Sequence, residues 1–136
     1  QPLGTMIETP RAALIAGDLA PLVDFMSFGT NDLTQMTYGF SRDDVEASVI
    51  KKYIEMDILQ ESPFAQLDAL GVGKLVQEAI NSSRAINPEI KIGICGEHGG
   101  DPTSIRFLAN SGVDYVSCSP PRIPIARLVC AQESLK

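Results

Sequence analysis

Short apolar runs alternate along the chain with longer segments in which apolar residues recur every three or four positions. We interpret four of the short runs as buried strands, at residues 3–7, 23–28, 90–95 and 113–118. The longer segments predict helices, because apolar side chains at that spacing fall on one face of a helix. A repeat of strand and helix is typical of an α/β protein with a parallel sheet.

Capping and turn residues indicate where the helices begin and end. Thr9 and Pro10 pair a favourable capping residue with a proline at the first helical position, which predicts a helix over residues 11–20. Pro21 is expected to end that helix, because proline does not continue a helix interior. The other segments expected to be helical are residues 71–85, 101–111, 124–132 and, with mixed signals, 33–70.

Chain length limits how the sheet can close. The 136 residues leave room for about four strand–helix units of roughly 30 residues each. A closed eight-stranded barrel takes about 250 residues, and four parallel strands do not close a small barrel by themselves. The sheet is therefore either open or half of a barrel. In the second case an apolar face and two strand edges need cover.

Charge and cysteine content narrow the functional classes. Lys and Arg number 11 against 17 acidic residues, and no basic run is present, so we expect no nucleic-acid binding. No stretch approaches the roughly 20 apolar residues that cross a membrane. Three widely spaced cysteines without a CxxC pair argue against a disulfide framework or a zinc site. We expect a cytoplasmic location, with an organelle as the alternative because a targeting segment would lie outside this sequence.

Two carboxylates follow the first two strands. Glu8 ends the first strand and Asp32 lies just past the second, so in neighbouring parallel strands they would share one edge of the sheet. Carboxylates combined with water and substrate oxygens suit Mg²⁺. The alternative is that both acids are solvated or cap helices. The turn formed by Gly29, Thr30, Asn31 and Asp32 either brings backbone N–H groups close to an anion or joins strand to helix without a ligand.

Cys95 ends the third strand and is followed by the glycine-rich, charged segment 96–101. A neutral thiol can donate a proton, so Cys95 is a candidate general acid; the alternative is a small buried hydrophobic residue. That second role is the one we assign to Cys118 and Cys130. His98, the only histidine, is interpreted as a hydrogen-bonding group behind the site rather than as a catalytic group.

The remaining charges carry no motif of their own. Arg42, Asp43, Asp44 and Glu61 are expected to be exposed loop charges.

Three long motifs resemble those of the phosphoenolpyruvate-utilising enzymes: Gly4–Arg11, Ser27–Gln35 and Gly93–Pro102. Within that superfamily the chain is most similar to the pyruvate, phosphate dikinase family; phosphoenolpyruvate synthase and Enzyme I of the sugar phosphotransferase system are the alternatives. The segments that look most like the dikinases are Phe40–Asp44, Glu97–Gly100, Val116–Pro120 and Arg122–Leu128.

The resemblance implies that residues 1–136 form part of one domain, the C-terminal half of a (β/α)₈ barrel that binds pyruvate or phosphoenolpyruvate. The four apolar runs would then be strands five to eight. Enzymes of the dikinase family interconvert ATP, phosphate and pyruvate with AMP, pyrophosphate and phosphoenolpyruvate. They do so through a phosphohistidine on a separate swivelling domain.

The family's functional positions carry over residue by residue. Glu8 and Asp32 match its Mg²⁺ ligands, which also contact substrate. Gly29, Thr30 and Asn31 match its substrate-binding turn. Cys95 matches its proton donor to the methylene carbon of enolpyruvate.

Other parts of the family's machinery have no counterpart in this sequence. These are strands one to four with the arginines that grip the phosphoryl group, the nucleotide domain and the phosphohistidine domain. His98 does not lie in the phosphorylated-histidine motif. We therefore expect the segment to be inactive alone, to work with those domains and to occur in a homodimer. A non-catalytic module that assembles through its half-barrel edges remains a separate hypothesis.

Overall fold

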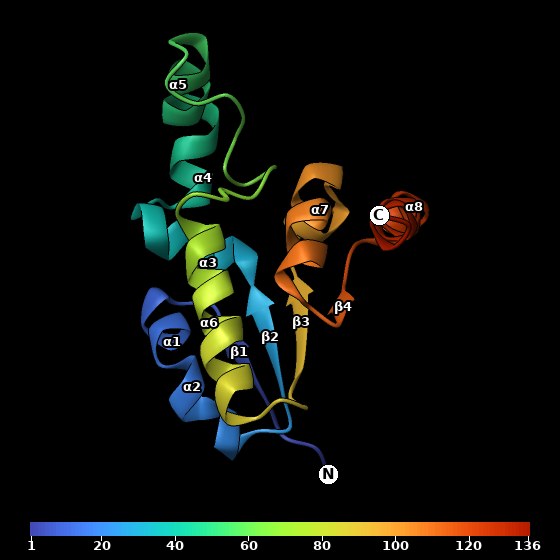
Figure 1. The fold of residues 1–136 in the computed structure, drawn as a ribbon. Coiled ribbons are helices and arrows are strands. Elements are labelled where there is room, and N and C mark those ends of the chain that lie inside the picture. The colour runs from blue at the N-terminus through green and yellow to red at the C-terminus, as the bar shows by residue number, and fades with distance from the viewer.

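Four parallel strands form a single sheet in the order β1–β2–β3–β4 (Figure 1). The computed structural model describes all residues from 1 to 136. It confirms an α/β architecture with four parallel strands, which is consistent with half of a phosphoenolpyruvate-binding barrel. The strands are β1 (Gly4–Ile7), β2 (Phe25–Gly29), β3 (Lys91–Cys95) and β4 (Tyr115–Val116).

Helices connect the strands and cover one face of the sheet. Figure 1 shows α1, α2 and α6 beside β1 and β2, α7 and α8 near β3 and β4, and α4 and α5 extending beyond the carboxyl ends of the strands. None of the helices combines the length and the apolar character that a membrane crossing requires. The helical elements are α1 (Pro10–Leu14), α2 (Ala16–Leu19), η1 (Ala20–Leu22), α3 (Thr30–Tyr38), α4 (Arg42–Val45), the π-helical turn η2 (Glu46–Ile50), α5 (Lys51–Glu55), α6 (Val72–Ile86), η3 (Glu97–Gly100), α7 (Pro102–Ser111), η4 (Pro120–Arg122) and α8 (Ile123–Ser134).

The main hydrophobic core lies between the sheet and these helices. Successive side chains in a strand point to opposite faces, so every second residue of a strand enters the core. Met26 and Phe28 of β2 and Ile92 and Ile94 of β3 are all buried there, where they pack in one cluster with apolar residues of α1, α2 and α6. Burial of this apolar face accounts for most of the stabilisation of the sheet.

The opposite face of the sheet is open and is built from small residues and aromatic rings. The ring of Phe25 lies over Gly4, and the ring of Tyr115 lies over Gly93, so that a Cβ atom at either glycine would collide with the neighbouring ring. Tyr115 remains 42% exposed. The open face expected for half of a barrel is therefore present opposite the helices, but it is mixed rather than apolar, because Ser27 and Lys91 lie on it beside the glycines.

Three predicted elements are wrong in extent, the first being the stretch 33–70, in which the helical elements α3, α4, η2 and α5 begin at Thr30 and end at Glu55. The single helix over 11–20 is two short helices that break at Ile15, because Gly17 lies close to the backbone of Ser82 and both short helices pack against α6. Pro21 lies inside the turn η1 rather than ending a helix.

The strand predicted at 113–118 contracts to the two residues of β4. The Asp114 N–H donates to the Ile92 carbonyl at 2.7 Å, but the Ile92 N–H donates to the Asp114 carboxylate at 2.7 Å instead of to a β4 carbonyl. The carboxylate also forms ion pairs with Arg84 and Lys91. Burial is the largest single influence on the Asp114 carboxyl, and it acts to raise the pKa. The hydrogen bond from the Ile92 N–H, together with the charges of Lys91 and Arg84, outweighs burial, so the pKa of Asp114 is lowered.

Truncation of Phe28 tests the assignment of the two faces of the sheet. Phe28→Ala should lower the free energy of unfolding by about 3–5 kcal/mol, because it leaves a cavity in the main core. Met36 of α3 is 61% exposed, so Met36→Ala should change it by no more than about 0.5 kcal/mol. Urea unfolding followed by circular dichroism measures both, and equal losses would contradict the assignment.

Candidate active site

Four residues form one row across the carboxyl ends of the strands. Gly29 pairs with Cys95 in the observed register, and the pairs Ile7–Phe28 and Ile94–Val116 place Glu8 beside Gly29 and Ser117 beside Cys95. The Ser117 N–H extends the β3–β4 pairing by donating to the Ile94 carbonyl at 2.8 Å. Strand alternation puts Glu8, Gly29, Cys95 and Ser117 on the open face, and we call them the rim row.

Gly29 separates the two reactive side chains of the rim row, and the Glu8 carboxylate and Met6 Cε lie over it. A Cβ atom on Gly29 would lie 2.8 Å from Glu8 Oε2, so the Glu8 carboxylate leans over the glycine. Neighbouring strands are about 4.8 Å apart, which puts the Cα atoms of Glu8 and Cys95 roughly 10 Å apart. A small molecule that displaced these side chains from Gly29 would contact Glu8 on one side and Cys95 on the other.

The two predicted metal-ligating carboxylates are free to accept a cation. Glu8 has no hydrogen-bond or ion-pair partner in the protein, and the exposed Asp32 accepts only from Gln35 Nε2, at 3.1 Å. No group of three or more histidine, cysteine, aspartate or glutamate side chains is gathered for a metal. Mg²⁺ is commonly held by one or two carboxylates, with waters and substrate oxygens completing its shell. The two free carboxylates are of the ligand type that Mg²⁺ takes, and the assignment of Glu8 and Asp32 as its ligands stays a prediction.

The predicted substrate-binding turn is the beginning of α3. Gly29 is the N-cap residue of this nine-residue helix, and no side chain caps its first N–H groups. Those free N–H groups and the helix dipole favour an anion at this end. Asn31 Oδ1 accepts the Glu97 N–H at 3.2 Å, which ties this turn to the loop after β3.

Thr30 contributes to the site differently from the other turn residues. Its side chain is fully buried, and Oγ1 lies 3.2 Å from the Cys95 carbonyl oxygen and 2.8 Å from His98 Nδ1. The hydroxyl therefore faces the protein interior, and only the backbone of Thr30 is presented at the end of the helix.

Cys95 is half-buried and has polar neighbours. Its thiol donates to the Phe28 carbonyl oxygen, with Sγ 3.5 Å away, and the Ser27 hydroxyl donates to Sγ at 3.7 Å. These contacts hold the thiol at the rim row and argue against a purely hydrophobic role for Cys95. Ser27 was missed in the sequence, although its spacing of two from Gly29 is the signal that places it on the same face.

His98 lies behind the rim row. It is fully buried, with Nδ1 2.8 Å from Thr30 Oγ1 and Nε2 2.8 Å from the Pro63 carbonyl oxygen. Burial lowers the pKa of His98, opposed by the hydrogen bond to Pro63. The structure thus places His98 as a hydrogen-bonding group, as its sequence context indicated.

Arg42 corrects the prediction of an exposed loop charge. It is half-buried at the start of α4, its guanidinium lies 5.9 Å from the centre of the Phe64 ring, and it pairs with Glu46 at 3.3 Å. The Arg42 N–H also donates to Gln35 Oε1 at 2.8 Å. Asp43, Asp44 and Glu61 are exposed as expected.

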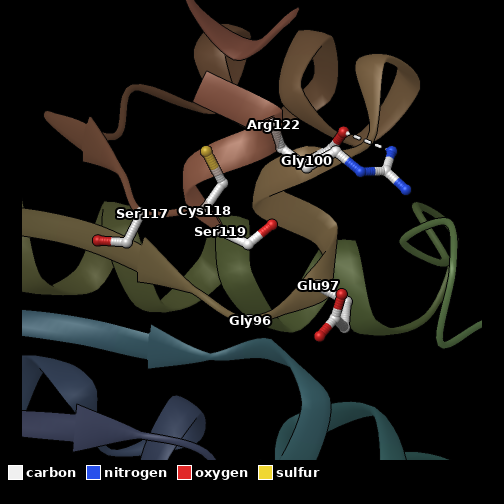
Figure 2. A pocket seen from close by; sticks show the side chains of 7 residues that line it. All are labelled: Gly96, Glu97, Gly100, Ser117, Cys118, Ser119 and Arg122. Carbon is white, nitrogen blue, oxygen red and sulfur yellow. Dashed lines mark hydrogen bonds between the residues drawn. The ribbon is translucent and has the colours of Figure 1, made fainter. Parts of the chain in front are cut away.

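A pocket of about 260 Å³ adjoins the rim row on the side of β4 (Figure 2). Arg122 reaches across it and donates to the Gly100 carbonyl oxygen at 3.4 Å. Glu8 and Asp32 do not line this pocket; they lie on the open part of the rim. The residues that line the pocket are Gly96, Glu97, Gly100, Ser117, Cys118, Ser119 and Arg122.

Cys118 and Cys130 are half-buried against a small apolar cluster between α7 and α8, in line with the packing role assigned to them.

The chain belongs to the phosphoenolpyruvate-utilising enzymes. Residues 1–135 match the family described as "PEP-utilising enzyme, PEP-binding domain". This confirms the resemblance carried by the sequence motifs, and it agrees with a parallel sheet whose polar residues gather at the carboxyl ends of the strands.

Individual relatives are pyruvate, phosphate dikinases. The chain is 59% identical over 130 residues to "Pyruvate, phosphate dikinase 1, chloroplastic" of Arabidopsis thaliana. The aligned segment covers 96% of this chain and 13% of that protein. It is 58% identical over 130 residues to "Pyruvate, phosphate dikinase 2" of Zea mays, covering 96% of this chain and 15% of that protein. The chain thus spans only a small part of the length of these relatives.

Two glycines with positive φ provide a test of how tightly the turns after β2 and β3 are joined. Gly96 has φ +122°, and a Cβ atom there would lie 2.6 Å from Thr30 Oγ1, whereas Gly39 has φ +66° and open space around it. Gly39→Ala should cost about 1 kcal/mol of unfolding free energy, from backbone strain alone. Gly96→Ala should cost at least about 2–3 kcal/mol, because its backbone region is almost restricted to glycine and Thr30 is crowded as well. Equal losses in urea unfolding would show that the two turns are not in close contact.

Proposed function

We propose that this segment carries the Mg²⁺-binding and proton-donating half of a site that interconverts pyruvate and phosphoenolpyruvate. The observation that carries the proposal is the rim row, in which Gly29 lies between Glu8 and Cys95. The Glu8 carboxylate has no partner in the protein, and the Cys95 thiol is held by a hydrogen bond to a backbone carbonyl. Membership of the family and the names of the relatives support the choice of substrate.

The chemistry requires charge stabilisation at oxygen and proton transfer at carbon. When the P–O bond of phosphoenolpyruvate breaks and the phosphoryl group passes to the histidine of the separate phosphohistidine domain, the electron pair left on oxygen forms the enolate of pyruvate. Mg²⁺ held by Glu8 and Asp32 would supply Lewis-acid stabilisation of the negative charge on the substrate oxygens. The N–H groups at the start of α3 would bind a substrate carboxylate in the same region.

Cys95 completes the reaction at the carbon atom. Its thiol gives a proton to the methylene carbon of the enolate, forming the methyl group of pyruvate and leaving a thiolate. In the reverse direction the thiolate removes a methyl proton. The bonds to Ser27 and the Phe28 carbonyl fix the position of Sγ, and Gly29 beside it has no side chain of its own to obstruct the substrate.

The complete reaction that we propose needs domains beyond this segment. In it, ATP, phosphate and pyruvate are interconverted with AMP, pyrophosphate and phosphoenolpyruvate through a phosphohistidine domain and a nucleotide domain. The segment alone would be inactive, since it has no residues to carry the phosphoryl group. Dimerisation and a cytoplasmic or organellar location stay predictions; the Arabidopsis relative is named as chloroplastic.

Replacement of Cys95 separates proton transfer at the pyruvate methyl carbon from the nucleotide half-reaction. In the complete protein, Cys95→Ala should slow solvent hydrogen exchange into the methyl group of pyruvate by at least about 100-fold, because the general acid is gone. Exchange of label between ATP and AMP should persist, since that half-reaction does not use the thiol. Isotope exchange followed by mass spectrometry measures both reactions.

Cys130 in α8 offers a matched control, because it packs against the small apolar cluster of α7 and α8 rather than beside Gly29. Cys130→Ala should leave both half-reactions unchanged. An equal loss of both half-reactions in Cys95→Ala, or full methyl exchange in that variant, would refute the role of Cys95.

A further inference from the structure

We propose that His98 is a positioning residue that fixes the start of α3, next to the substrate, through its bond to Thr30, while its separate bond to the Pro63 carbonyl anchors the loop around Pro63. This inference rests on the proposed function for its catalytic consequence. Its structural basis is the pair of 2.8 Å contacts that His98 makes on opposite sides of its ring, to Thr30 Oγ1 and to the Pro63 carbonyl oxygen.

The partners of His98 determine where its proton resides. The Pro63 carbonyl can only accept a hydrogen bond, so Nε2 must carry the hydrogen. Burial lowers the pKa of His98, which favours the neutral ring with an unprotonated Nδ1. Nδ1 must then accept, and the Thr30 hydroxyl must donate to it.

The Thr30 hydroxyl has a second acceptor within reach. The Cys95 carbonyl oxygen lies 3.2 Å from Oγ1, but one hydroxyl hydrogen cannot serve both acceptors well. Loss of His98 Nδ1 would redirect this hydrogen toward the Cys95 carbonyl. Thr30 is the first residue of α3, so a shift of its side chain moves the N–H groups that face the substrate.

The two bonds of His98 have separable consequences. The bond to Thr30 acts on the start of α3, whereas the bond to Pro63 anchors an irregular segment between α5 and α6. A histidine that merely filled the interior would affect both regions together. A positioning residue would affect catalysis through the Thr30 bond alone.

Two substitutions each retain one of these bonds. The amide group of asparagine lies as far from the backbone as Nδ1, so His98→Asn can still accept from Thr30 but does not reach Pro63. The amide group of glutamine lies as far out as Nε2, so His98→Gln can still donate to Pro63 but leaves Thr30 without its acceptor. Both variants are polar and similar in size, which makes them matched controls for each other.

Kinetics on the complete protein test the catalytic consequence. We expect His98→Gln to lower kcat for methyl-hydrogen exchange of pyruvate by about 10- to 100-fold with a smaller change in KM, because misplacement of a binding group costs rate. His98→Asn should stay within about threefold of the unsubstituted protein, and ATP–AMP exchange should be unchanged in both. Thr30→Val should resemble His98→Gln, whereas Thr30→Ser, which keeps the hydroxyl, should retain activity. Equal losses in His98→Asn and His98→Gln, or no loss in either, would overturn the positioning role.

Amide hydrogen exchange tests the same bonds without any activity. By mass spectrometry, His98→Gln should accelerate exchange at least about tenfold in the peptide that spans residues 29–35, and His98→Asn should do so around residues 61–66. The same pattern in both variants would refute the inference even if the proposed function holds. Absence of methyl exchange in the unsubstituted protein would instead refute the proposed function, and the catalytic role of His98 with it. Faster amide exchange in a different peptide for each of the two variants would still support the two bonds of His98.

Discussion

The parallel register of β1, β2 and β3 is the constraint on which the site depends. It places Glu8, Gly29 and Cys95 side by side at the strand ends, although 87 positions (95 − 8) separate the first from the last in sequence. A shift of one residue in either pairing would turn one of these side chains toward the core. Packing of Met26, Phe28 and the β3 isoleucines against the helices prevents such a shift, so the hydrophobic core also fixes the chemistry of the rim.

The loops after the strands form a second level of organisation. The Asn31 side chain accepts a hydrogen bond from the Glu97 N–H, and the Thr30 side chain lies close to Gly96, where a Cβ atom would collide with it. His98 is hydrogen-bonded to Thr30 in the protein interior. The turn after β2 and the turn after β3 are therefore held as one unit, which keeps the first turn of α3 in a defined position relative to the thiol. Pre-positioned N–H groups and a fixed proton donor lower the reorganisation that a reaction requires.

Local sequence patterns predict which segments form the strands, but they do not predict what each segment packs against. The four strands and the candidates Glu8 and Cys95 follow from apolar runs that end in polar or glycine-rich turns. The break at Ile15, the shortened β4 and the burial of Arg42 depend on partners distant in sequence, such as Ile92 for Asp114, and no local pattern reveals them. The period-two alternation of β2 places Ser27 on the face of Gly29, but a serine within an apolar run carries no chemical signal of its own.

The most direct measurement is a crystal structure of the complete protein with Mg²⁺ and oxalate, a planar dianion that mimics the pyruvate enolate. We expect oxalate to lie over Gly29, with the metal in contact with Glu8 and Asp32 and with Cys95 Sγ about 3–4 Å from the ligand. Oxalate bound elsewhere, for example in the pocket between the β3 and β4 loops, with Glu8 and Cys95 both distant from it, would contradict the account.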